Sequence, residues 1–533
     1  MTEWWRDAVI YQIYPRSFQD SNGDGIGDLP GITRRLDHVA SLGVDAIWLS
    51  PIFTSPMKDM GYDVSDYCDI DPLFGTLADF DALVARAHDL GLKVIIDQVI
   101  SHSSDKHPWF AESRQSRDND RADWYVWADP NPDGTPPNNW PSVFGGPAWE
   151  WEPRRRQYYL HNFLIEQPDL NLWNRDVQDA LLGTMRFWLD RGVDGFRLDT
   201  VNFYFHDARL RNNPPSPDHA APDTYNYQHH VYSKNRPENI AFLKRMRKLT
   251  DDYDARMMVG EVGESGDTSI RIMAEYTAGD DRLHMCYSFE MLSHEFTARH
   301  FRHTIKGVHQ GAPDAHACWS FSNHDVFRHV TRWLPHAESP EAMARQAAAM
   351  LLSFPGTICL YQGEELGQTE TDLSYDELTD PPALRFWPEI KGRDGCRTPM
   401  VWDDSPHAGF STTKPWLPVK EPQAARAVTG QQDGNDSVLS AYRATIAFRK
   451  SQMPLRVGDT AFLDLPEPIL AFHRGTGDQV LTCVFNLSPN PATLTLSDKA
   501  DLTGPSQAAL SGRVLSLPPN GFAWLDGPVS LLA

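Results

Sequence analysis

Three acidic and three basic residues stand in short motifs that could carry out chemistry on a polar substrate. They are Asp199, Glu261 and Asp325, together with His102, Arg197 and His324. Any one alone could belong to a buried ion pair, but three carboxylates meeting at one site suit the cleavage of a glycosidic bond. One ionised carboxylate would attack the anomeric carbon, a second, kept protonated, would donate to the leaving oxygen, and a third would stabilise the cationic transition state. Arg197, two residues from Asp199 on the same strand face, would keep that carboxylate ionised.

These residues are far apart in the chain and need a scaffold that brings them together. Short apolar runs alternate with amphipathic helical patterns, which indicates βα units and a parallel sheet. Eight strands are expected, near residues 8–15, 45–51, 92–102, 193–200, 256–263, 285–291, 317–325 and 357–365. We therefore predict an α/β fold built on a closed (β/α)8 TIM barrel, in which the carboxyl ends of the strands meet at one face.

Two stretches do not fit the barrel pattern. Residues 103–171 are rich in Asp, Asn, Pro and Trp and lack a long period, so we expect an inserted domain after strand three. Residues 453–533 show short alternating runs separated by Gly, Pro and Asn, which predict a C-terminal antiparallel β-sandwich. The barrel would then comprise residues 1–102 and 172–452.

Composition limits the partners of the chain. Its 533 residues carry a formal charge of -23 at pH 7, which argues against nucleic acid and anionic membranes, because both favour basic surfaces. The first residues show no leader pattern, and no apolar stretch approaches the roughly 20 residues of a membrane span. We expect a cytoplasmic protein, monomer or homodimer, that acts on small neutral molecules. Its six scattered cysteines would be reduced.

The stretch DSNGDGIGDLPG, residues 20–31, has the composition of a cation-binding loop. Asp20, Asn22, Asp24 and Asp28 alternate with glycines, as oxygen ligands do around a hard cation. It is not an EF-hand, because the twelfth position is Gly31 rather than Glu and a strand-like run precedes the loop. A surface turn without an ion is the alternative.

The chain contains DQVISH (97–102), GFRLDT (195–200), GEVG (260–263), FSNHD (321–325), QPDLN (167–171) and MGYDVSDY (60–67). Together they resemble the signature regions of glycoside hydrolase family 13, the α-amylase family, over almost the whole chain. The opening WWRDAVIYQIYPRSFQDSNGDGIGDL is similar to the branch of oligo-1,6-glucosidases and α-glucosidases. The resemblance implies a retaining, exo-acting α-glucosidase that releases terminal glucose from short α-glucosides, with transglucosylation to other acceptors as an extension.

The resemblance also implies a role for each candidate residue. Asp199 would be the nucleophile, Glu261 the general acid and then base, and Asp325 the stabiliser of the transition state. The bound glucose would stack on Tyr62 and accept or donate hydrogen bonds at His102, Arg197 and His324. Asp59 and Arg397 would close the far end of the pocket, and Phe144 would line the entrance or anchor the inserted domain. A structural calcium ion, or magnesium, would be held by Asp20, Asn22, Asp24, Asp28 and the carbonyl of Ile26.

Two positions depart from the family pattern. Ser101 stands where many relatives have an Asn that binds the interdomain calcium of α-amylases, which puts that second ion in doubt. Thr200 follows the nucleophile in place of the Val associated with isomaltose-type cleavage. This tilts the expectation toward α-1,4 linkages, as in maltose.

Other functions remain open at this point. Sucrose hydrolysis or isomerisation, trehalose synthesis and oligo-1,6-glucosidase activity occur in the same branch. A non-catalytic relative, like the subunits of amino-acid transporters, is the alternative from another class. Such relatives have lost catalytic carboxylates and carry a membrane anchor, whereas this chain keeps Asp199, Glu261 and Asp325. A calcium sensor would rest on residues 20–31 alone.

Overall fold

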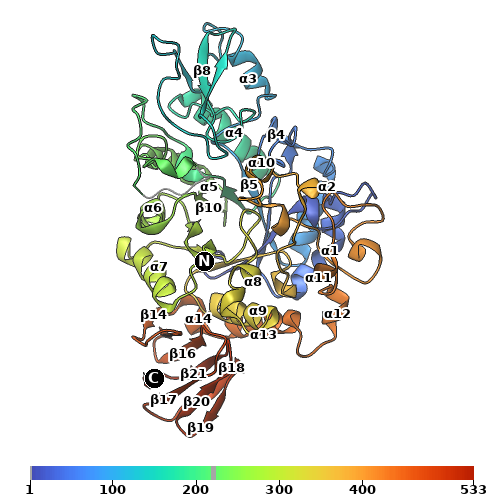
Figure 1. The fold of residues 1–533 in the computed structure, drawn as a ribbon, viewed down its shortest axis with the longest axis vertical. Coiled ribbons are helices and arrows are strands. Elements are labelled where there is room, and N and C mark those ends of the chain that lie inside the picture. Colours follow the sequence, from blue (N-terminus) through green and yellow to red (C-terminus); the bar gives the residue numbers. More distant parts are fainter. Residues whose placement is uncertain (1–2, 218–223, 533) are drawn as a thin grey trace.

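The computed structural model describes residues 3–217 and 224–532 (Figure 1). In this part of the chain, a sheet of eight parallel strands has the order β11-β10-β9-β5-β2-β1-β13-β12. The strands are β1 (Val9–Ile13), β2 (Ala46–Leu49), β5 (Lys93–Gln98), β9 (Gly195–Leu198), β10 (Met257–Val262), β11 (Met285–Ser288), β12 (Cys318–Trp319) and β13 (Thr357–Tyr361). A parallel bridge between Cys286 and Ala317 joins the two outer strands of that order and closes the ring. The predicted TIM barrel is confirmed.

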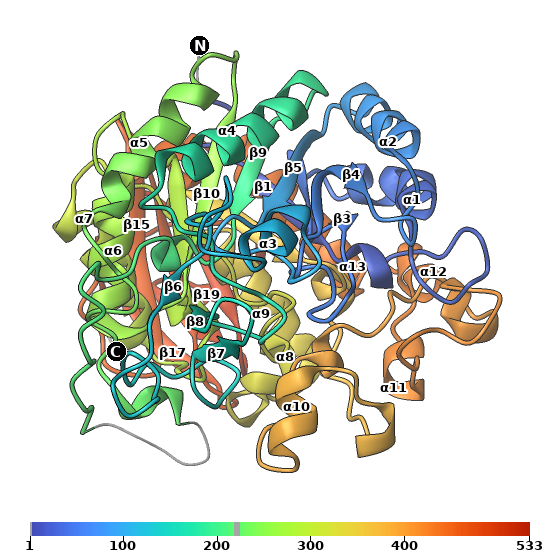
Figure 2. The ribbon, with the colours of Figure 1, turned by 90° about the horizontal axis from the view of Figure 1, so that it is seen from above.

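Helices surround this sheet, as Figure 2 shows from above. Those that follow the barrel strands are α1 (Leu29–Ser41), α2 (Leu77–Asp89), α4 (Arg175–Asp190), α5 (Asn239–Thr250), α6 (Gly266–Thr277), α7 (Ala298–Gly311), α9 (Pro340–Leu351) and α13 (Val438–Ser451). Shorter helices are α8 (His329–Arg332), α10 (Pro381–Phe386), α11 (Glu421–Ala424), α12 (Val428–Gln432) and α14 (Met453–Val457). Polar side chains cap the starts of several of the longer helices, such as α1, α4 and α9. Thr76 and Asp79, for example, form a capping box at the start of α2.

The barrel strands read as continuous apolar runs because both of their faces are buried. On β1, Ile10 packs into the barrel interior with Trp48 and Ile95, whereas Tyr11 packs outward into the core shared with the helices. Parallel sheets covered on both faces lack the alternation of half-exposed strands. No helix in the described part of the chain combines the length and apolar composition of a membrane span. All six cysteines are free thiols.

A small antiparallel sheet lies between β5 and α4, at the end of the molecule opposite the C-terminus (Figure 1). Its strands are β6 (Trp127–Ala128), β7 (Trp149–Glu152) and β8 (Gln157–Leu160), and α3 (Pro108–Ser113) precedes them. Trp140 and Trp149 form the centre of its separate apolar core. A further hairpin, β3 (Phe53–Thr54) with β4 (Asp66–Ile70), carries the loop that contains Asp59 and Tyr62.

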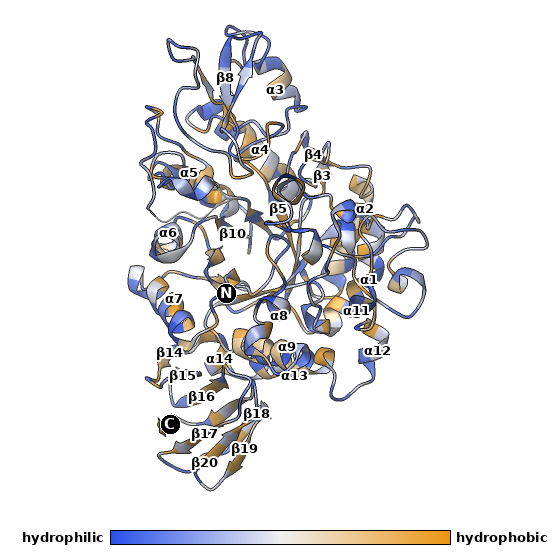
Figure 3. Cartoon of the chain, viewed as in Figure 1, coloured by the Kyte–Doolittle hydropathy of each residue, from blue (hydrophilic) through white to orange (hydrophobic). Residues whose placement is uncertain are grey.

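The C-terminal part forms two antiparallel sheets, and hydrophobic colouring runs along their strands in Figure 3. One contains β14 (Asp459–Phe462), β15 (Ile469–Thr476), β16 (Gln479–Asn486), β18 (Leu502–Gln507) and β21 (Phe522–Asp526). The other contains β17 (Ala492–Leu496), β19 (Ala509–Ser511), β20 (Val514–Leu517) and β22 (Leu531–Leu532). Val484 and Ala523 of the first sheet pack with Leu494 and Leu515 of the second in one buried cluster. The predicted β-sandwich is confirmed.

Candidate active site

The predicted carboxylates lie together at the carboxyl ends of the barrel strands. Asp199 directly follows β9, Glu261 is on β10, and Asp325 is in the loop after β12. They line a cavity of about 460 Å³, the size of a site for a small ligand. Asp59, Tyr62, His102 and Phe144 also line this cavity. The sequence prediction that these segments meet at one mouth is therefore consistent with the geometry.

Arg197 lies beneath the cavity and forms ion pairs with three carboxylates. Its guanidinium is fully buried and contacts Asp97 at 2.8 Å, Asp199 at 2.7 Å and Glu261 at 2.8 Å. It also donates to the Tyr287 hydroxyl at 2.9 Å. A rigid fork of five N–H donors can serve several acceptors at once, as a lysine could not. Arg197 thus fixes the nucleophile and acid candidates relative to one another rather than binding substrate alone.

Burial raises the pKa of Asp199 and of Glu261 to about 7, against the opposing pull of Arg197. Repulsion by neighbouring carboxylates adds to the rise. The sequence analysis expected Arg197 to keep Asp199 ionised. Three buried carboxylates share its single positive charge, so Arg197 alone does not keep Asp199 fully ionised near pH 7. Near neutral pH the pair Asp199 and Glu261 can hold one proton, and that is the state in which one group attacks while the other donates.

Asp325 differs from that pair. Burial would raise its pKa, but His324, Arg393 and Arg397 together hold the pKa of the Asp325 carboxyl well below its usual range. Its Oδ1 lies 3.0 Å from Arg397 and 3.2 Å from Arg393. Asp325 consequently stays ionised, which is the state needed to stabilise a developing positive charge.

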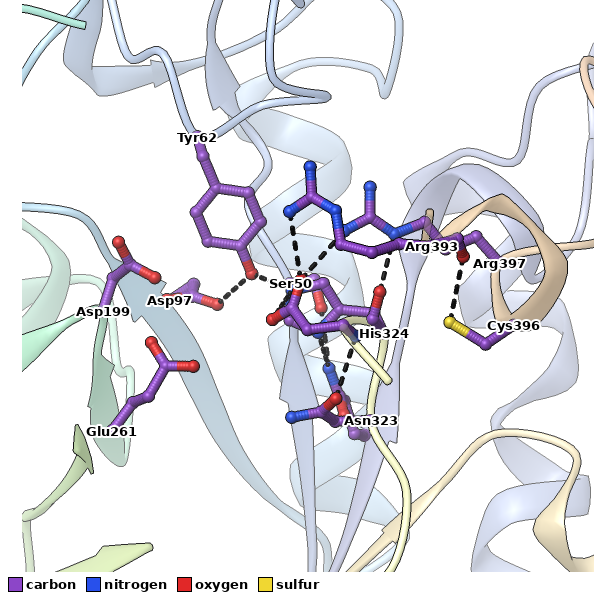
Figure 4. A network of polar contacts seen from close by, with 12 residues as sticks. Ser50, Tyr62, Asp97, Asp199, Glu261, Asn323, His324, Arg393, Cys396 and Arg397 are labelled. Atoms are coloured by element: carbon purple, nitrogen blue, oxygen red, sulfur yellow. Dashed lines mark hydrogen bonds and ion pairs between the residues drawn. The ribbon is translucent and has the colours of Figure 1, made fainter. Parts of the chain in front are cut away.

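Tyr62 and His324 lie against each other beside these carboxylates (Figure 4). Their ring centroids are 5.4 Å apart with nearly parallel planes, and the Tyr62 hydroxyl contacts Asp97 at 3.1 Å and Nε2 of His324. The Gln12 amide nitrogen lies 2.8 Å from Nδ1 of His324 and donates to it, so Nε2 carries the ring proton. Burial lowers the pKa of His324 well below its usual value and leaves the ring neutral.

The far end of the cavity differs from the sequence prediction. Asp59 contacts Arg393, at 2.9 Å, rather than Arg397. Arg397 is fully buried, donates to the His324 carbonyl at 2.6 Å and supports Asp325 from behind. The Arg393 guanidinium lies 5.1 Å from the centroid of the Phe144 ring. Asp59, Arg393 and Phe144 together are called the far wall below, and Phe144 is a lining residue as well as part of the inserted segment.

Residues 12–458 match the family model described as Alpha amylase, catalytic domain. The chain belongs to the α-amylase family, glycoside hydrolase family 13. This confirms the family that the sequence motifs resemble.

Relatives in the α-amylase family place the chain in its α-glucosidase and oligo-1,6-glucosidase branch. It is 57% identical to a probable α-glucosidase of Rhizobium meliloti, over 93% of this chain and 92% of that protein. It is 38% identical to the oligo-1,6-glucosidase of Heyndrickxia coagulans, over 93% and 94% of the two chains. The crystal structure of the α-glucosyl transfer enzyme XgtA matches with a TM-score of 0.96 and 53% identity, over 99% and 100%. A trehalulose synthase, MutB, matches with a TM-score of 0.88 and 32% identity, over 98% and 99%.

The loop expected to bind calcium follows β1. Hydrogen bonds between its carboxylates and its own backbone N–H groups stabilise its conformation. The Asp20 carboxylate accepts hydrogen bonds from the N–H groups of Gly23 at 2.7 Å and Gly25 at 2.9 Å. Asp28 accepts from the Gly31 N–H at 2.7 Å and caps α1. The donor set is all oxygen, which suits a hard cation. Within residues 3–217 and 224–532, however, no three acidic, histidine or cysteine side chains gather as a metal-binding cluster.

Several residues of the site were missed from the sequence. Asp97 begins the motif DQVISH but was given no role. Arg393 lies four residues before Arg397 in GRDGCR, and the motif alone does not tell which arginine faces the cavity. Gln167 of QPDLN donates to Asp59 at 3.1 Å. Tyr287 had no signal beyond its place on a predicted strand.

Proposed function

We propose that the protein is a retaining, exo-acting α-glucosidase that acts on short α-glucosides, preferentially with α-1,4 linkages. The observation that carries this proposal is the pairing of Asp199 and Glu261 on one buried arginine at the floor of a pocket whose far end is walled. The relatives named α-glucosidase and oligo-1,6-glucosidase support the same class of substrate.

In the first step, the Glu261 carboxyl gives its proton to the glycosidic oxygen while Asp199 attacks the anomeric carbon. The bond to the leaving group breaks, and a glucosyl ester forms on Asp199. The ring carbon gains positive charge on the way, and the ionised Asp325 stabilises it. The raised pKa of Glu261, about 7, keeps the acid protonated at neutral pH.

In the second step, Glu261 is a carboxylate and acts as a base. It takes a proton from the incoming hydroxyl, whose oxygen attacks the anomeric carbon and releases Asp199. Two inversions leave the α configuration unchanged. If the hydroxyl belongs to water the reaction is hydrolysis, and if it belongs to a sugar or another alcohol it is transglucosylation.

The far wall supports an exo mode of action. Arg393 bridges Asp59 and Asp325, and Phe144 packs beside it, so a sugar chain cannot continue past the terminal glucose. The α-1,4 preference rests on Thr200, which lines the cavity next to the nucleophile. It remains a proposal, because named relatives include oligo-1,6-glucosidases.

Transfer is the second candidate, favoured by the aromatic lining of the cavity. Phe163, Phe203 and Phe289 line it, together with Lys234 and Glu264. Aromatic walls hold an organic acceptor better than water. The likeness to the α-glucosyl transfer enzyme supports it as well, and the likeness to the trehalulose synthase keeps sucrose isomerisation as an alternative.

One experiment separates these activities. Purified protein is incubated with maltose, isomaltose and sucrose, each with and without a phenolic acceptor, and the products are resolved by chromatography. Glucose from maltose, at a rate above that from isomaltose, is the expected result, with a glucoside of the phenol added when transfer occurs. Absence of both glucose and transfer product from every substrate would contradict the proposal.

We further propose that the loop of Asp20, Asn22, Asp24, Ile26 and Asp28 binds calcium, or magnesium, in a structural role. Its support is the all-oxygen donor set and the pKa of Asp20, which backbone N–H groups and Ser411 lower despite burial, so that this carboxylate is ionised. The cytoplasmic location and the monomeric or dimeric state also stay predictions. Light scattering of the purified protein checks the latter.

A further inference from the structure

Two hydroxyl groups connect His102 with Asp199 through the wall of the cavity. The Oγ of Ser101 lies 2.8 Å from Nδ1 of His102 and 3.0 Å from Oγ1 of Thr200. The Oγ1 of Thr200 in turn lies 3.3 Å from Oδ2 of Asp199. Ser101 is buried, whereas Thr200 lines the cavity. The two positions at which the sequence departs from its family are therefore in direct contact.

The direction of these hydrogen bonds follows from the groups at the His102 end. Nε2 of His102 lies 3.0 Å from the carbonyl oxygen of Tyr62, which can only accept, and 3.1 Å from the amide nitrogen of Gln167, which donates to Asp59. The shorter contact assigns the ring proton to Nε2, because an unprotonated Nε2 would set its lone pair against those of the carbonyl oxygen. Burial lowers the pKa of His102 to about 4, so the ring is neutral at pH 7 and Nδ1 is an acceptor. Ser101 must donate its single proton to Nδ1. Its oxygen is then left to accept from Thr200.

The Thr200 hydroxyl consequently has one proton and two acceptors. The Ser101 oxygen, at 3.0 Å, is nearer than Oδ2 of Asp199, at 3.3 Å, and takes the larger share. The Thr200 backbone cannot turn to change this balance, because it is held in the left-handed region at φ 41° and its N–H donates to Glu261 at 2.9 Å. Oδ2 of Asp199 is therefore left weakly hydrogen-bonded, while Oδ1 accepts from Arg197 at 2.7 Å.

We propose that Ser101 is a positioning residue for the nucleophile: by accepting the Thr200 proton, it withholds that hydroxyl from Oδ2 of Asp199 and leaves this oxygen free to attack. The inference rests on the proposed function, since it assigns Oδ2 of Asp199 as the attacking atom. A hydrogen bond to a carboxylate stabilises its ionised form and makes it a weaker nucleophile. Removing the Ser101 hydroxyl releases the Thr200 proton onto Asp199 and produces both effects.

A change at Ser101 leaves the other groups that act on Asp199 in place. Glu261 contacts the same arginine from β10, and the remaining charged or titratable groups around the nucleophile come from several elements. They are Arg197 on β9, Asp97 on β5, Tyr62 in the loop between β3 and β4, Tyr204 after β9 and Asp325 after β12. A shift caused by Ser101 must therefore pass through Thr200 or His102.

A double-mutant cycle distinguishes these two routes. Ser101→Ala, Thr200→Val and the double variant are compared with the wild type, using kcat/KM on an aryl α-glucoside from pH 4 to 9. We expect Ser101→Ala to move the acid limb of the profile down by about half a pH unit and to lower kcat/KM roughly threefold to tenfold. In the Thr200→Val background, Ser101→Ala should leave the acid limb where it is. Ser101→Thr, which keeps the hydroxyl, should retain the wild-type limb.

Two results would overturn the inference. One is an acid limb that stays at the wild-type pH in Ser101→Ala. If the melting temperature alone falls, Ser101 has only a structural role. The other is an equal shift with and without Thr200, which would make His102 the route. The Thr200→Val variant alone gives a further check should Ser101→Ala not fold, since its acid limb should differ little from that of the wild type. Failure of the proposed function is distinct, because the wild type itself would then release no glucose from any α-glucoside.

Discussion

Asp59 and Arg393 lie 2.9 Å apart at the far end of the cavity, although 334 positions separate them in the chain. The same guanidinium contacts Asp380 at 2.7 Å and Asp325 at 3.2 Å. The group that ends the pocket thus also contacts Asp325, the carboxylate that the proposed mechanism assigns to transition-state stabilisation. Under that mechanism, one side chain couples substrate length to transition-state stabilisation.

Replacing Arg393 by lysine should damage binding of the terminal glucose. The ammonium keeps the charge but has no planar fork, so it cannot serve Asp59, Asp325 and Asp380 together. We expect KM for maltose to rise and kcat/KM to fall by about tenfold or more, on the order of 1.4 kcal/mol of transition-state stabilisation. Steady-state kinetics check this, with Arg271→Lys on the exposed side of α6 as the matched control. An unchanged KM would show that the far wall does not contact the sugar.

The sequence could locate the carboxylates but not the arginine that completes the pocket. Asp199 and Glu261 were found because barrel strands buried on both faces are continuous apolar runs, and a polar residue that ends such a run lies at the mouth. Arg393 and Arg397 instead lie on either side of the short helical turn Asp394–Cys396, in a long segment without periodicity. Which of them faces the cavity depends on where that segment packs, and no local pattern encodes this.

The local sequence pattern also could not predict the contact between Ser101 and Thr200. Neighbouring strands β5 and β9 pair Asp97 with Arg197 in parallel, and this register brings the residues just beyond both strands together. Each residue was singled out from the sequence as a separate departure. Their joint action requires the register, which the hydrophobic pattern of strands buried on both faces specifies only weakly.

Replacing Asp199 by asparagine should abolish turnover and leave the fold intact. The amide has almost the same shape but cannot form the glucosyl ester, so we expect kcat to fall by roughly 10⁴-fold or more. Mass spectrometry with a fluorinated glucosyl fluoride, which slows release of the ester, should find the adduct on the peptide containing Asp199 in the wild type and none in the variant. Asp251→Asn, at an exposed position after α5, is the control. An adduct on another residue would move the nucleophile elsewhere.

The alkaline limb of the activity profile should belong to Glu261. Since the acid must be protonated and its pKa is about 7, kcat/KM for maltose should decline as the pH rises through 7. Glu261→Gln cannot donate this proton, and we expect a loss of roughly 10²- to 10⁴-fold on maltose. An aryl glucoside with a good leaving group needs less protonation, so its glucosylation should suffer less and lose the alkaline limb. Equal losses on both substrates would argue against Glu261 as the acid.

Calcium should stabilise the fold before it affects the chemistry. A ligand that binds only the folded state at 100 times its Kd adds about 2.7 kcal/mol, and chelation removes that contribution. We expect EGTA to lower the melting temperature by a few degrees while kcat at 25 °C stays constant. Asp24→Ala should lose this response, and exposed Asp433→Ala should keep it. The Asp24 carboxylate accepts one backbone N–H, that of Ile26. Asp20 accepts three backbone N–H groups and Asp28 caps α1, so replacing either would disturb the loop even without an ion.

A lower melting temperature without loss of activity is the result expected when a structural ion is removed. The opposite pattern, in which EGTA abolishes turnover at an unchanged melting temperature, would contradict the structural role. A melting temperature that ignores both EGTA and added calcium would leave residues 20–31 as an ion-free turn. Repeating the titration with magnesium determines which ion the loop prefers.

Glu261 should also make the folded protein less stable as the pH rises. Its pKa is about 7 in the folded state and near 4.5 in the unfolded chain, so the folded state binds the extra proton between these values. The stabilisation is complete below pH 4.5 and is lost as the pH passes through 7, with each pKa unit worth about 1.4 kcal/mol. Glu261→Gln carries no titrating proton. Its melting temperature should therefore exceed that of the wild type at pH 8 by more than it does at pH 5, and a difference that shrinks between pH 5 and pH 8 would refute the assignment. The same carboxyl that supplies the proton for catalysis is thus expected to cost stability wherever it is ionised.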